Sequence, residues 1–576
     1  MPYRAIYVVD TEYFGEAGDI ITPVCLVVRD LVSGTVQGFW QDELLTMHRA
    51  PFDTGPEALF VSFFAPAELG FFKALGWPMP ERIFDCYAEF RCETNGQILS
   101  HGKSLLGAML FFGLETIEAE AKKDMRSLIL SGGPWDDNQK SEIINYCITD
   151  VDALARLFPC MINRWIIDDR RLGQALLRGR YMAAVVCMEH AGIPIDVPLL
   201  KKFWENWDRI KHKLISRVDS AFNVYTDGHF KEALFENYLI QEGIPWPRHE
   251  SGRLALDRDT FKMQKNTYPK LAPLYYLRNT LAELRHNGLT IGRDGRNRAM
   301  LSPFGSKTGR NQPSTSKFIF GSPAWVRGFI KPAPGFSLAY CDWRSQEIAV
   351  AAARSADQAM WNAYASGDIY IAFAIGAGLA PLGATKASHR TVREQCKAIV
   401  LGLQYGMTPI GIARGSTLLF AEAQDLVRRH RETYPGFWRW VRQNVDAALF
   451  GLPLNTCFGW KIQTGYGTDP KERTFMNWPM QSDAAEMLRI ACCLATEAGL
   501  TVAAPIHDAI LLEASTDRIY EDVDRLKHIM QEASELVLGE GKICGVDVNI
   551  IHYPNRFQDE RGAEMWDIIM KLLDDV

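Results

Sequence analysis

The sequence predicts a multidomain protein that combines an α/β domain with an α+β region. The chain has 576 residues, which is enough for about three or four domains at roughly 150 residues each. Apolar residues make up 47% and charged residues 23%, a balance typical of globular proteins with sizeable cores. Short β-rich runs alternate with helical stretches in the first part of the chain, whereas isolated apolar strands enclose a long helical segment in the last part.

The N-terminal part is predicted to be the α/β domain. The runs Ala5–Val9 and Thr22–Val28 predict strands, and helical stretches follow up to about residue 165. A domain boundary is expected between Arg164 and Arg180, where the sequence is polar and poorly periodic. Met182–His190 then predicts an amphipathic helix, and Ala191–Asp196 a helix stop followed by a turn.

The C-terminal part is predicted to be the α+β region. Residues 197–290 are expected to be largely helical. Gly292–Gln312 is rich in Arg, Gly, Ser and Pro, which indicates a loop that crosses a phosphate surface. Apolar strands are expected around Phe336–Asp342 and Pro505–Glu513, with a helical insertion between them from about Tyr370 to Ala448.

Composition excludes some classes and leaves others open. The formal net charge of −6 gives no sign of nucleic-acid binding, but a basic groove can lie on a protein whose outer surface is acidic. The twelve cysteines include no Cys-x-x-Cys pair, so we expect free thiols in a reducing cytosol rather than a zinc site. No secretory segment is recognised and no apolar run reaches the ~18 residues that a membrane span needs, which predicts a soluble intracellular protein.

Two acids in apolar strands are the first candidate site. Asp342 ends the run Phe336–Asp342, and Asp508 interrupts what is predicted to be one strand, Ala503–Leu512. The simpler interpretation of either acid alone is a helix cap or a salt bridge. Paired across adjacent strands, however, they could hold two Mg²⁺ ions ~3.5–4 Å apart, because a buried carboxylate is costly to ionise without a nearby cation.

A stripe of residues at intervals of four is the second candidate site. Arg393, Lys397, Leu401 and Tyr405 would share one slowly drifting helix face. A solvated basic face is the simpler interpretation, but such a face would not usually carry Leu and Tyr in register. The pattern favours Arg393 and Lys397 as phosphate ligands, with Lys397 as general acid for pyrophosphate, and Leu401 and Tyr405 against the incoming base and sugar. Acids on strands plus this stripe are what metal-assisted nucleotide transfer from a triphosphate requires.

The order of these strings resembles family A DNA polymerases, the bacterial DNA polymerase I type, in a bacteriophage version. Asp342 with Glu347 is similar to that family's motif A, the stripe to motif B, and His507-Asp508 to motif C. Further segments look like the family, and they span nearly the whole chain: Thr308-Gly309-Arg310, Arg473-x-x-x-Asn477-x-x-x-Gln481, Tyr434-Pro435-Gly436 and Met188-Glu189-His190-Ala191-Gly192.

The resemblance implies roles and an architecture. Asp342 and Asp508 would ligate the metals, and Glu347 would be the steric gate that rejects a ribose 2′-hydroxyl. The residues expected to contact DNA near the primer terminus are Arg310, Arg473, Asn477, Gln481 and His507. The implied fold is an RNase H-like exonuclease domain at 1–170 followed by a right-hand polymerase at 171–576. Its thumb would span about 180–290, its palm about 291–365 and 450–576, and its fingers about 366–449.

Three positions depart from the family's pattern. Ala509 stands where a third acid usually follows Asp508, although that acid is usually the least essential of the three, so activity is expected to survive. Leu401 replaces the family's Phe or Tyr, which puts sugar discrimination in doubt. Arg344 falls inside motif A with no role that the sequence assigns.

The N-terminal acids form the third candidate site. Asp10 and Glu12 lie two apart on a strand, so both carboxylates project from one face, and Tyr146 lies one helical turn before Asp150. A solvated strand end is the simpler interpretation of Asp10 and Glu12 alone. With Asp85 added, the set resembles the Asp-Glu-Asp-Asp 3′→5′ exonucleases, which implies four acids on two metals, a water held by Tyr146, and a working proofreader. A 5′-nuclease domain is expected to be absent.

The resemblance therefore predicts a template-directed DNA polymerase with 3′→5′ proofreading that serves phage DNA replication. Two Mg²⁺ ions are expected at each site, with Mn²⁺ as a substitute. Expected partners are primer–template DNA, deoxynucleoside triphosphates and phage accessory proteins, with no membrane, for a monomer in the cytoplasm of the infected bacterial host. The preferred nucleobase, including 2-aminoadenine in place of adenine, stays open.

Three alternatives remain at this point. A single-subunit RNA polymerase shares most of the signals, but Glu347 and the exonuclease acids argue against it. A DNA-binding scaffold with a decayed polymerase site is hinted at only by Ala509. A nuclease without synthesis is the third. Primer extension with ribonucleotides and deoxynucleotides would separate them.

Overall fold

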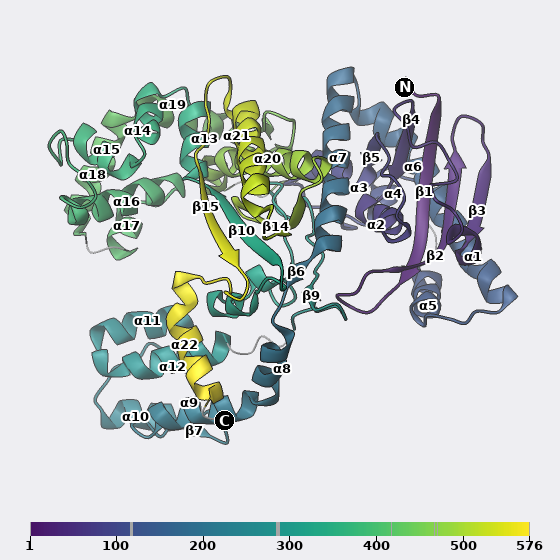
Figure 1. The fold of residues 1–576 in the computed structure, drawn as a ribbon. Coiled ribbons are helices and arrows are strands. Elements are labelled where there is room, and N and C mark those ends of the chain that lie inside the picture. Colours follow the sequence, from purple (N-terminus) through teal and green to yellow (C-terminus); the bar gives the residue numbers. More distant parts are fainter. Residues whose placement is uncertain are drawn as a thin grey trace. The chain divides into compact units, whose positions relative to one another are not determined.

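The structure is a computed structural model that describes residues 2–115, 119–283, 288–415, 418–465, 467, 468 and 471–574 (Figure 1). The chain divides into two compact units. The first comprises Met1–Gly192, Leu301–Gln312 and Ser337–Ile550, and the second comprises Ile193–Met300, Pro313–Phe336 and Ile551–Val576. This division differs from the boundary expected near residue 170, because the N-terminal residues belong to the same unit as Asp342 and Asp508.

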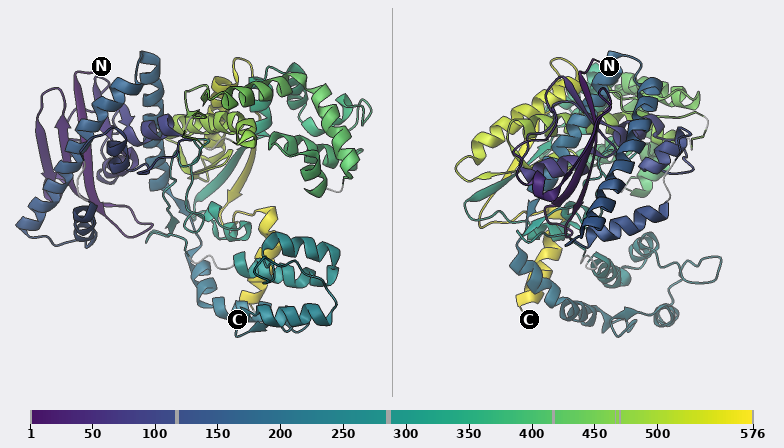
Figure 2. Two further views of the ribbon diagram at one scale, coloured as in Figure 1. Left: turned by 180° about the vertical axis from the view of Figure 1, so that it is seen from behind. Right: turned by 90° about the vertical axis from the view of Figure 1, so that its right-hand side faces the viewer.

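The N-terminal part of the first unit is built on a five-stranded mixed sheet, whose strands are seen side by side in Figure 2. The order is β3-β2-β1-β4-β5; β2 pairs antiparallel with β1 and β3, whereas β4 pairs parallel with β1 and β5. The strands are β1 (Ala5–Phe14), β2 (Thr22–Asp30), β3 (Val36–Trp40), β4 (Ala58–Ser62) and β5 (Ile83–Asp85). The two predicted strands are therefore present, as β1 and β2.

Helices close the core of this sheet. α1 (Gln41–Leu44), α2 (Ala65–Leu75), α5 (Ala119–Leu130) and α6 (Asp137–Trp165) contact its strands, whereas α3 (Cys86–Thr94) and α4 (Leu105–Phe111) pack against α6. Val8, Val27 and Leu59 of the sheet and Val151 and Leu157 of α6 are fully or almost fully buried together. Burying such aliphatic side chains stabilises the fold by about 1.5–3 kcal/mol each.

The segment expected to be a domain boundary is largely helical. α7 runs from Asp169 to Ala191, so it begins well before the predicted helix at Met182–His190. Asp168 caps it by accepting from the Arg171 amide, and Leu172, Ala175 and Gly179 are buried. The prediction failed because the charged residues at the start of α7 obscured the spacing of its buried face. Only the short stretch between Trp165 and Asp168 separates α6 from α7.

A second sheet carries the predicted palm acids, in the order β13-β14-β10-β15. Its strands are β10 (Phe336–Trp343), β13 (Thr501–Ile506), β14 (Ala509–Ser515) and β15 (Val546–His552). The single strand predicted at Ala503–Leu512 is wrong: it is an antiparallel hairpin in which Ile506 pairs with Ala509 and His507-Asp508 form the turn. The apolar pattern continues through the turn, and no Gly or Asn marks it. The helices α20 (Glu472–Glu497) and α21 (Ile519–Leu538) pack against this sheet, and α13 (Gln346–Arg354) packs against both of these helices.

The helical insertion expected at Tyr370–Ala448 is present. Its helices are α15 (Ile369–Gly376), α16 (Arg390–Gln404), α17 (Pro409–Gly415), α18 (Phe420–Thr433) and α19 (Pro435–Leu449). α14 (Gln358–Ala365) precedes them, and the short pair β11 (Leu454–Asn455) and β12 (Lys461–Ile462) follows. α15, α16 and α18 pack against one another.

The second unit is mostly helical, as predicted for residues 197–290. Its elements are β6 (Ile193–Pro194), α8 (Val197–Glu205), α9 (Trp207–Asp219), β7 (Tyr225–Thr226), β8 (His229–Phe230), α10 (Glu232–Gln241), α11 (Arg258–Thr267), η1 (Pro269–Leu271), α12 (Ala272–Glu283), β9 (Arg296–Asn297), η2 (Ile319–Gly321), η3 (Ala324–Phe329), η4 (Glu560–Gly562) and α22 (Ala563–Asp574). It also takes in 313–336 and 551–576, which the sequence assigned to the palm. The Trp566 ring lies 5.1 Å from that of Phe329 and covers Gly328, which ties α22 to η3.

All twelve cysteines are free thiols, as expected from their spacing. Across the residues that the structure describes, no helix combines the length and apolar character that a membrane crossing needs.

Candidate active sites

The hairpin between β13 and β14 brings the two palm acids together. Asp342 is the penultimate residue of β10, and Asp508 lies in the turn that leads into β14, the neighbour of β10. The backbone N–H of Trp343 donates to the carbonyl of Asp508 at 3.1 Å. His507 has a φ of 52°, so the turn places a non-glycine residue in the left-handed region. Two acids 166 positions apart in the sequence therefore meet at one edge of the sheet.

Their environment disfavours negative charge. Burial, followed by the charges of Asp508 and Asp547, raises the pKa of Asp342 to about 7. Burial also raises the pKa of Asp508, while Arg310 and His507 oppose that shift. Asp342 Oδ1 is buried and accepts no hydrogen bond in the described structure. An orphaned carboxylate oxygen beside a second acid fits a divalent cation, because oxygen ligands are what Mg²⁺ takes.

The protein ligands alone do not complete such a site. Among the described residues, no three His, Cys, Asp or Glu side chains form a ready-made metal group. Ala509, which follows Asp508, is fully buried in β14. Any ion held by Asp342 and Asp508 would therefore take its remaining ligands from substrate oxygens or water, as Mg²⁺ usually does at phosphoryl-transfer sites.

Residues of three separate motifs converge beside these acids. Glu347 lies in the first turn of α13 and accepts from Arg310 Nη2 at 2.6 Å. Tyr405 follows the end of α16 and hydrogen-bonds to Glu347; burial and then this carboxylate raise the pKa of its hydroxyl to about 12. The charge of Asp508 also acts on Tyr405. Arg310, Glu347 and Tyr405 thus form one connected group next to the palm acids.

The α16 stripe forms a face as predicted, but its first cation is engaged. Arg393 donates to Asp368 at 2.6 Å and to Glu394 at 2.9 Å, and its guanidinium lies 5.1 Å from the Tyr370 ring centroid. Lys397 is exposed, Leu401 is half-buried and Tyr405 is 40% exposed. The opposite face is buried through Cys396, Ile399, Val400 and Leu403, as expected.

The predicted minor-groove residues share one side of α20. Arg473, Asn477 and Gln481 follow one another at intervals of four, so they lie in a row. Arg473 is exposed and donates to the Tyr405 carbonyl at 2.8 Å, which links α20 to the end of α16. Asn477 is half-buried with an Oδ1 that accepts no hydrogen bond, Gln481 is half-buried, and His507 is exposed.

Arg344, for which the sequence assigned no role, joins two strands. Its side chain pairs with Asp547 on β15, and its backbone N–H donates to the Gly545 carbonyl at 2.8 Å. The Tyr364 hydroxyl donates to the Arg344 carbonyl at 3.1 Å. Arg344, which directly follows β10, therefore links the end of β10 to the start of β15.

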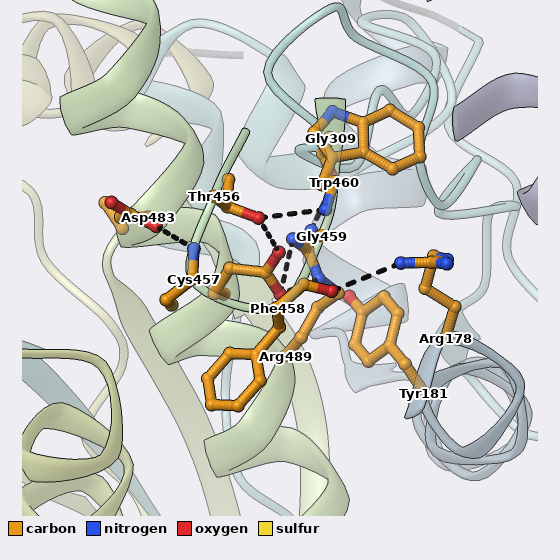
Figure 3. Close-up of polar contacts among 12 residues, drawn as sticks. Arg178, Tyr181, Gly309, Thr456, Cys457, Phe458, Gly459, Trp460, Asp483 and Arg489 are labelled. Atoms are coloured by element: carbon orange, nitrogen blue, oxygen red, sulfur yellow. Dashed lines mark hydrogen bonds and ion pairs between the residues drawn. The ribbon is translucent and has the colours of Figure 1, made fainter. Parts of the chain in front are cut away.

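The loop that carries Arg310 is held by buried groups. Arg489 Nη1 of α20 donates to the Gly309 carbonyl at 2.7 Å and pairs with Glu486. Thr456 Oγ1 donates to Glu486 Oε1 at 2.7 Å and accepts from the Trp460 amide at 2.9 Å. Figure 3 shows Thr456, Trp460 and Arg489 gathered around Gly309, with Arg178 reaching the carbonyl of Phe458. The position of Arg310 is therefore set by a buried polar network.

The N-terminal acids also come together, around β1 and α6. Asp10 and Glu12 lie two residues apart on β1, so they share one face of the strand, as predicted. Tyr146 hydrogen-bonds to Asp150 one turn later on α6; burial and then the charges of Asp150, Glu12 and Asp10 raise the pKa of its hydroxyl far above the usual value. The Cys147 thiol lies 3.2 Å from Asp10 Oδ2. Asp10, Glu12 and Asp150 thus all act on Tyr146, although among the described residues no three acids lie close enough to form a ready-made metal group.

Asp85 and Glu68 are two further acids of the N-terminal part, and they differ in their hydrogen bonds. Asp85 is the N-cap of α3, with Oδ1 accepting from the Ala88 amide at 2.7 Å and Oδ2 from the Ala65 amide at 2.6 Å. Both of its oxygens therefore already have a structural role. Glu68 of α2 is buried, and burial followed by the charge of Asp10 raises its pKa well above the usual value. Its Oε2 accepts no hydrogen bond in the described structure. Sequence reasoning missed Glu68, although an acid among the apolar residues of α2 was an available signal.

Comparison with known proteins identifies the family. A sequence model of DNA polymerase family A matches residues 199–549. The chain belongs to family A. The match contains Asp342, Glu347, the α16 stripe and Asp508, whereas residues 1–198 lie outside it. Family A polymerases use divalent metal ions, generally Mg²⁺.

The relatives of this family A chain are bacterial polymerases. It is 21% identical over 378 residues to a thermostable DNA polymerase I of Thermus filiformis, covering 61% of this chain and 44% of that protein. It is 22% identical over 434 residues to DNA polymerase I of Aquifex aeolicus, covering 69% and 73%. The chain thus spans less than half the length of the first curated relatives it matches.

A solved structure extends the likeness in fold. The chain resembles the POL domain of Pol1 from M. smegmatis, solved in complex with DNA primer-template and dNTP, with a TM-score of 0.73 and 16% identity. The likeness covers 94% of this chain and 95% of that one. The mixed α/β fold of a DNA polymerase I-type polymerase therefore extends over most of this family A chain.

Proposed function

We propose that the protein is a template-directed DNA polymerase that extends a primer 3′ end, with a 3′→5′ exonuclease in its N-terminal part. The observation that carries the synthesis proposal is the meeting of Asp342 and Asp508 at one sheet edge, beside Arg310, Glu347 and Tyr405. Bound Mg²⁺ ions would supply Lewis-acid chemistry there, activating the primer hydroxyl and neutralising charge on the triphosphate.

The surrounding side chains take roles that follow from their positions. Lys397 is exposed on the α16 face and is proposed to bind the triphosphate and pass a proton to the leaving pyrophosphate. Arg393 would bind phosphate by exchanging Asp368 for a stronger anionic partner. Leu401 and Tyr405 would pack on the base and sugar. Glu347, fixed by Arg310 and Tyr405, would occupy the space that a 2′-hydroxyl needs, which favours deoxynucleotides over the RNA polymerase alternative.

DNA contacts are proposed for the row on α20 and for the loop of Arg310. Arg473, Asn477 and Gln481 present donors in register, a pattern suited to minor-groove acceptors. Arg310 and His507 would act at the primer terminus. Lys103 and Lys307 lie near this loop: burial, followed by the charges of Arg91 and Lys307, lowers the pKa of Lys103 to about 8. These two lysines are proposed to face the phosphate backbone.

The exonuclease proposal rests on the N-terminal cluster. We propose Asp10, Glu12, Glu68 and Asp150 as the metal-binding acids, with Tyr146 holding the attacking water. Glu68 takes the place that the sequence gave to Asp85, because both Asp85 oxygens are held by backbone amides. The strand order β3-β2-β1-β4-β5, in which only β2 runs antiparallel to the other strands, supports an RNase H-like fold. Proposed partners are primer–template DNA and dNTPs, in phage replication within the host cytoplasm.

Primer extension tests the proposal. Purified protein with a labelled primer–template and Mg²⁺ should extend the primer with deoxynucleotides and much less with ribonucleotides. Without triphosphates it should shorten the primer from its 3′ end. Absence of extension would leave a nuclease or a DNA-binding scaffold. Equal use of ribonucleotides would favour the RNA polymerase alternative.

A further inference from the structure

We infer that helix α3 of the N-terminal part positions Arg310, so that Arg91 and Asn95 act on primer-terminus binding although neither is placed at the reacting atoms. This inference rests on the proposed function, in which Arg310 contacts the primer end. Residues 304–310 are called here the Arg310 loop. They belong to the same compact unit as α3.

The Arg310 loop has a conformation that it would not hold alone. Ser302, just before the loop, and Phe304, its first residue, have φ values of 49° and 57°, in the left-handed region that a non-glycine residue adopts only when surrounding structure imposes it. A Cβ on Gly309 would lie 3.0 Å from the Trp460 indole, so the loop also lies tightly against that ring. Contacts from elsewhere must therefore stabilise it.

Two residues at the end of α3 supply such contacts. Arg91 donates to the Phe304 carbonyl through Nε at 3.1 Å and Nη2 at 2.7 Å, and Nη2 also reaches the Gly305 carbonyl. Asn95, the C-cap of α3, donates from Nδ2 to the Lys307 carbonyl at 2.6 Å and to the Lys461 carbonyl at 2.7 Å. α3 thus binds the carbonyls of three residues of the loop.

The Lys307 carbonyl is the strongest anchor. Besides Asn95, it accepts from Trp478 Nε1 at 2.8 Å and Trp460 Nε1 at 3.2 Å. Phe304 is fully buried; its ring stacks on Trp460 at 5.1 Å, and the Arg489 guanidinium lies 5.0 Å from it. The loop is therefore held both by α3 and by Arg489 of α20, which donates to the Gly309 carbonyl (Figure 3).

The arrangement separates positioning from chemistry. Arg310 itself reaches Glu347, whereas Arg91 and Asn95 bind only backbone carbonyls in the recorded contacts of their side chains with the loop. Releasing α3 from the loop should let Arg310 leave its productive position, and with it the contact to Glu347 and the charge that acts on Asp508. The expected effect is weaker binding of the primer terminus, which Arg310→Ala should reproduce.

The test is a double-mutant cycle in the full chain. Arg91→Lys keeps the charge but cannot reproduce the forked contact, and Asn95→Asp keeps the shape but replaces the Nδ2 amide group, which makes both donations, with an acceptor oxygen. Each of these two substitutions is combined with Arg310→Ala, and primer–template dissociation constants are measured at fixed salt. We expect each single variant to weaken binding about tenfold and to add little further loss once Arg310 is gone, since residues that act through one another are non-additive.

Glu93→Gln is the matched control. Glu93 lies on the same helix and pairs with Lys461 Nζ at 2.6 Å, but its recorded side-chain contacts do not include the Arg310 loop. Its effect on binding should be small and should add fully to that of Arg310→Ala. Degradation of single-stranded DNA should be unchanged in Arg91→Lys, which shows that the N-terminal part stays folded. If Asn95→Asp fails to fold, Arg91→Lys alone decides.

The outcomes distinguish two failures. If Arg310→Ala weakens binding but the α3 variants are silent or fully additive with it, the positioning inference is wrong and the proposed function stands. If Arg310→Ala itself leaves binding unchanged, the role proposed for Arg310 fails, and the inference fails with it.

Discussion

The two acid clusters of the first unit both bury carboxyl groups, but they differ in the charges that surround these groups. Around Asp342 and Asp508, the charges of Arg310 and His507 partly offset the cost of an ionised Asp508. In the N-terminal part, the charges that act on buried Glu68 are those of other acids, Asp10 and Asp85. The protein thus partly neutralises Asp508, whereas a negative charge on Glu68 would need a metal ion or a proton to neutralise it.

The difference shows which acids the fold needs and which the chemistry needs. Asp85 satisfies two backbone amides and is explained by structure alone. Asp342 and Glu68 each leave a buried oxygen without a hydrogen bond, and structure alone does not explain that cost. Orphaned buried carboxylates are therefore the better guide to ion sites in this chain.

The largest expected effect separates the two clusters by activity. Asp342→Asn or Asp508→Asn should lower primer extension by ~10³-fold or more, because a metal ligand carries several kcal/mol of transition-state stabilisation. Degradation of single-stranded DNA should persist. Asp10→Ala should do the reverse. Gel assays of both activities check this, and an active Asp342→Asn would make the palm assignment wrong.

The next effect separates Glu68 from Asp85. Glu68→Gln should abolish degradation without lowering the melting temperature, because it removes a carboxyl whose charge is disfavoured. Asp85→Asn should lower the free energy of unfolding by about 1–2 kcal/mol, as loss of a cap does, yet keep degradation. Thermal melting and a single-strand degradation assay measure the pair. The opposite pattern would restore Asp85 as the metal ligand.

A smaller effect follows from the pKa of Asp342. In the unfolded chain this acid ionises near 3.8, whereas in the folded protein its pKa is about 7. Between these values the folded state holds the extra proton, so its contribution to stability is present below pH 3.8 and is lost as the pH rises to about 7. In metal-free buffer the melting temperature of the protein, relative to Asp342→Asn, should fall from pH 5 to pH 8. Saturating Mg²⁺ should reduce that fall, because it binds the ionised form. A difference independent of pH would contradict the shift.

The smallest effect concerns the α16 face. Leu401→Phe fills more of the space beside Tyr405 and should change discrimination between deoxy- and dideoxynucleotides by about tenfold or less, the range that a modest pocket change gives. Competitive incorporation at one template position measures the ratio. An unchanged ratio would remove Leu401 from sugar selection.

The sequence predicted the strand that carries Asp342 and the helix face that carries the stripe, because strand and helix signals are local. Asp342 ends an apolar run, and the four-residue interval of α16 reports one helix face directly. It did not predict the turn at His507-Asp508, because a two-residue hairpin without Gly or Asn has the same apolar pattern as a continuous strand.

The N-terminal site was predicted less completely for a tertiary reason. Asp10, Glu12, Tyr146 and Asp150 follow from spacing within single elements. Choosing between Glu68 and Asp85 depends on which carboxylate the backbone has already engaged, and that is fixed only when α2, α3 and β5 assemble. The division into units also depends on contacts between distant segments, such as Trp566 against Gly328.

The three hydrogen bonds accepted by the Lys307 carbonyl have a practical consequence for the design of a variant without the proposed exonuclease activity. Deleting the first 165 residues would remove α3 and its hydrogen bond to that oxygen. The remaining fragment would have unpaired polar groups, and Phe304 would become exposed to solvent. If the proposed exonuclease is correct, a single substitution at Asp10 would remove 3′→5′ degradation while leaving α3 in contact with the loop. In this protein, truncation and point substitution are therefore not equivalent.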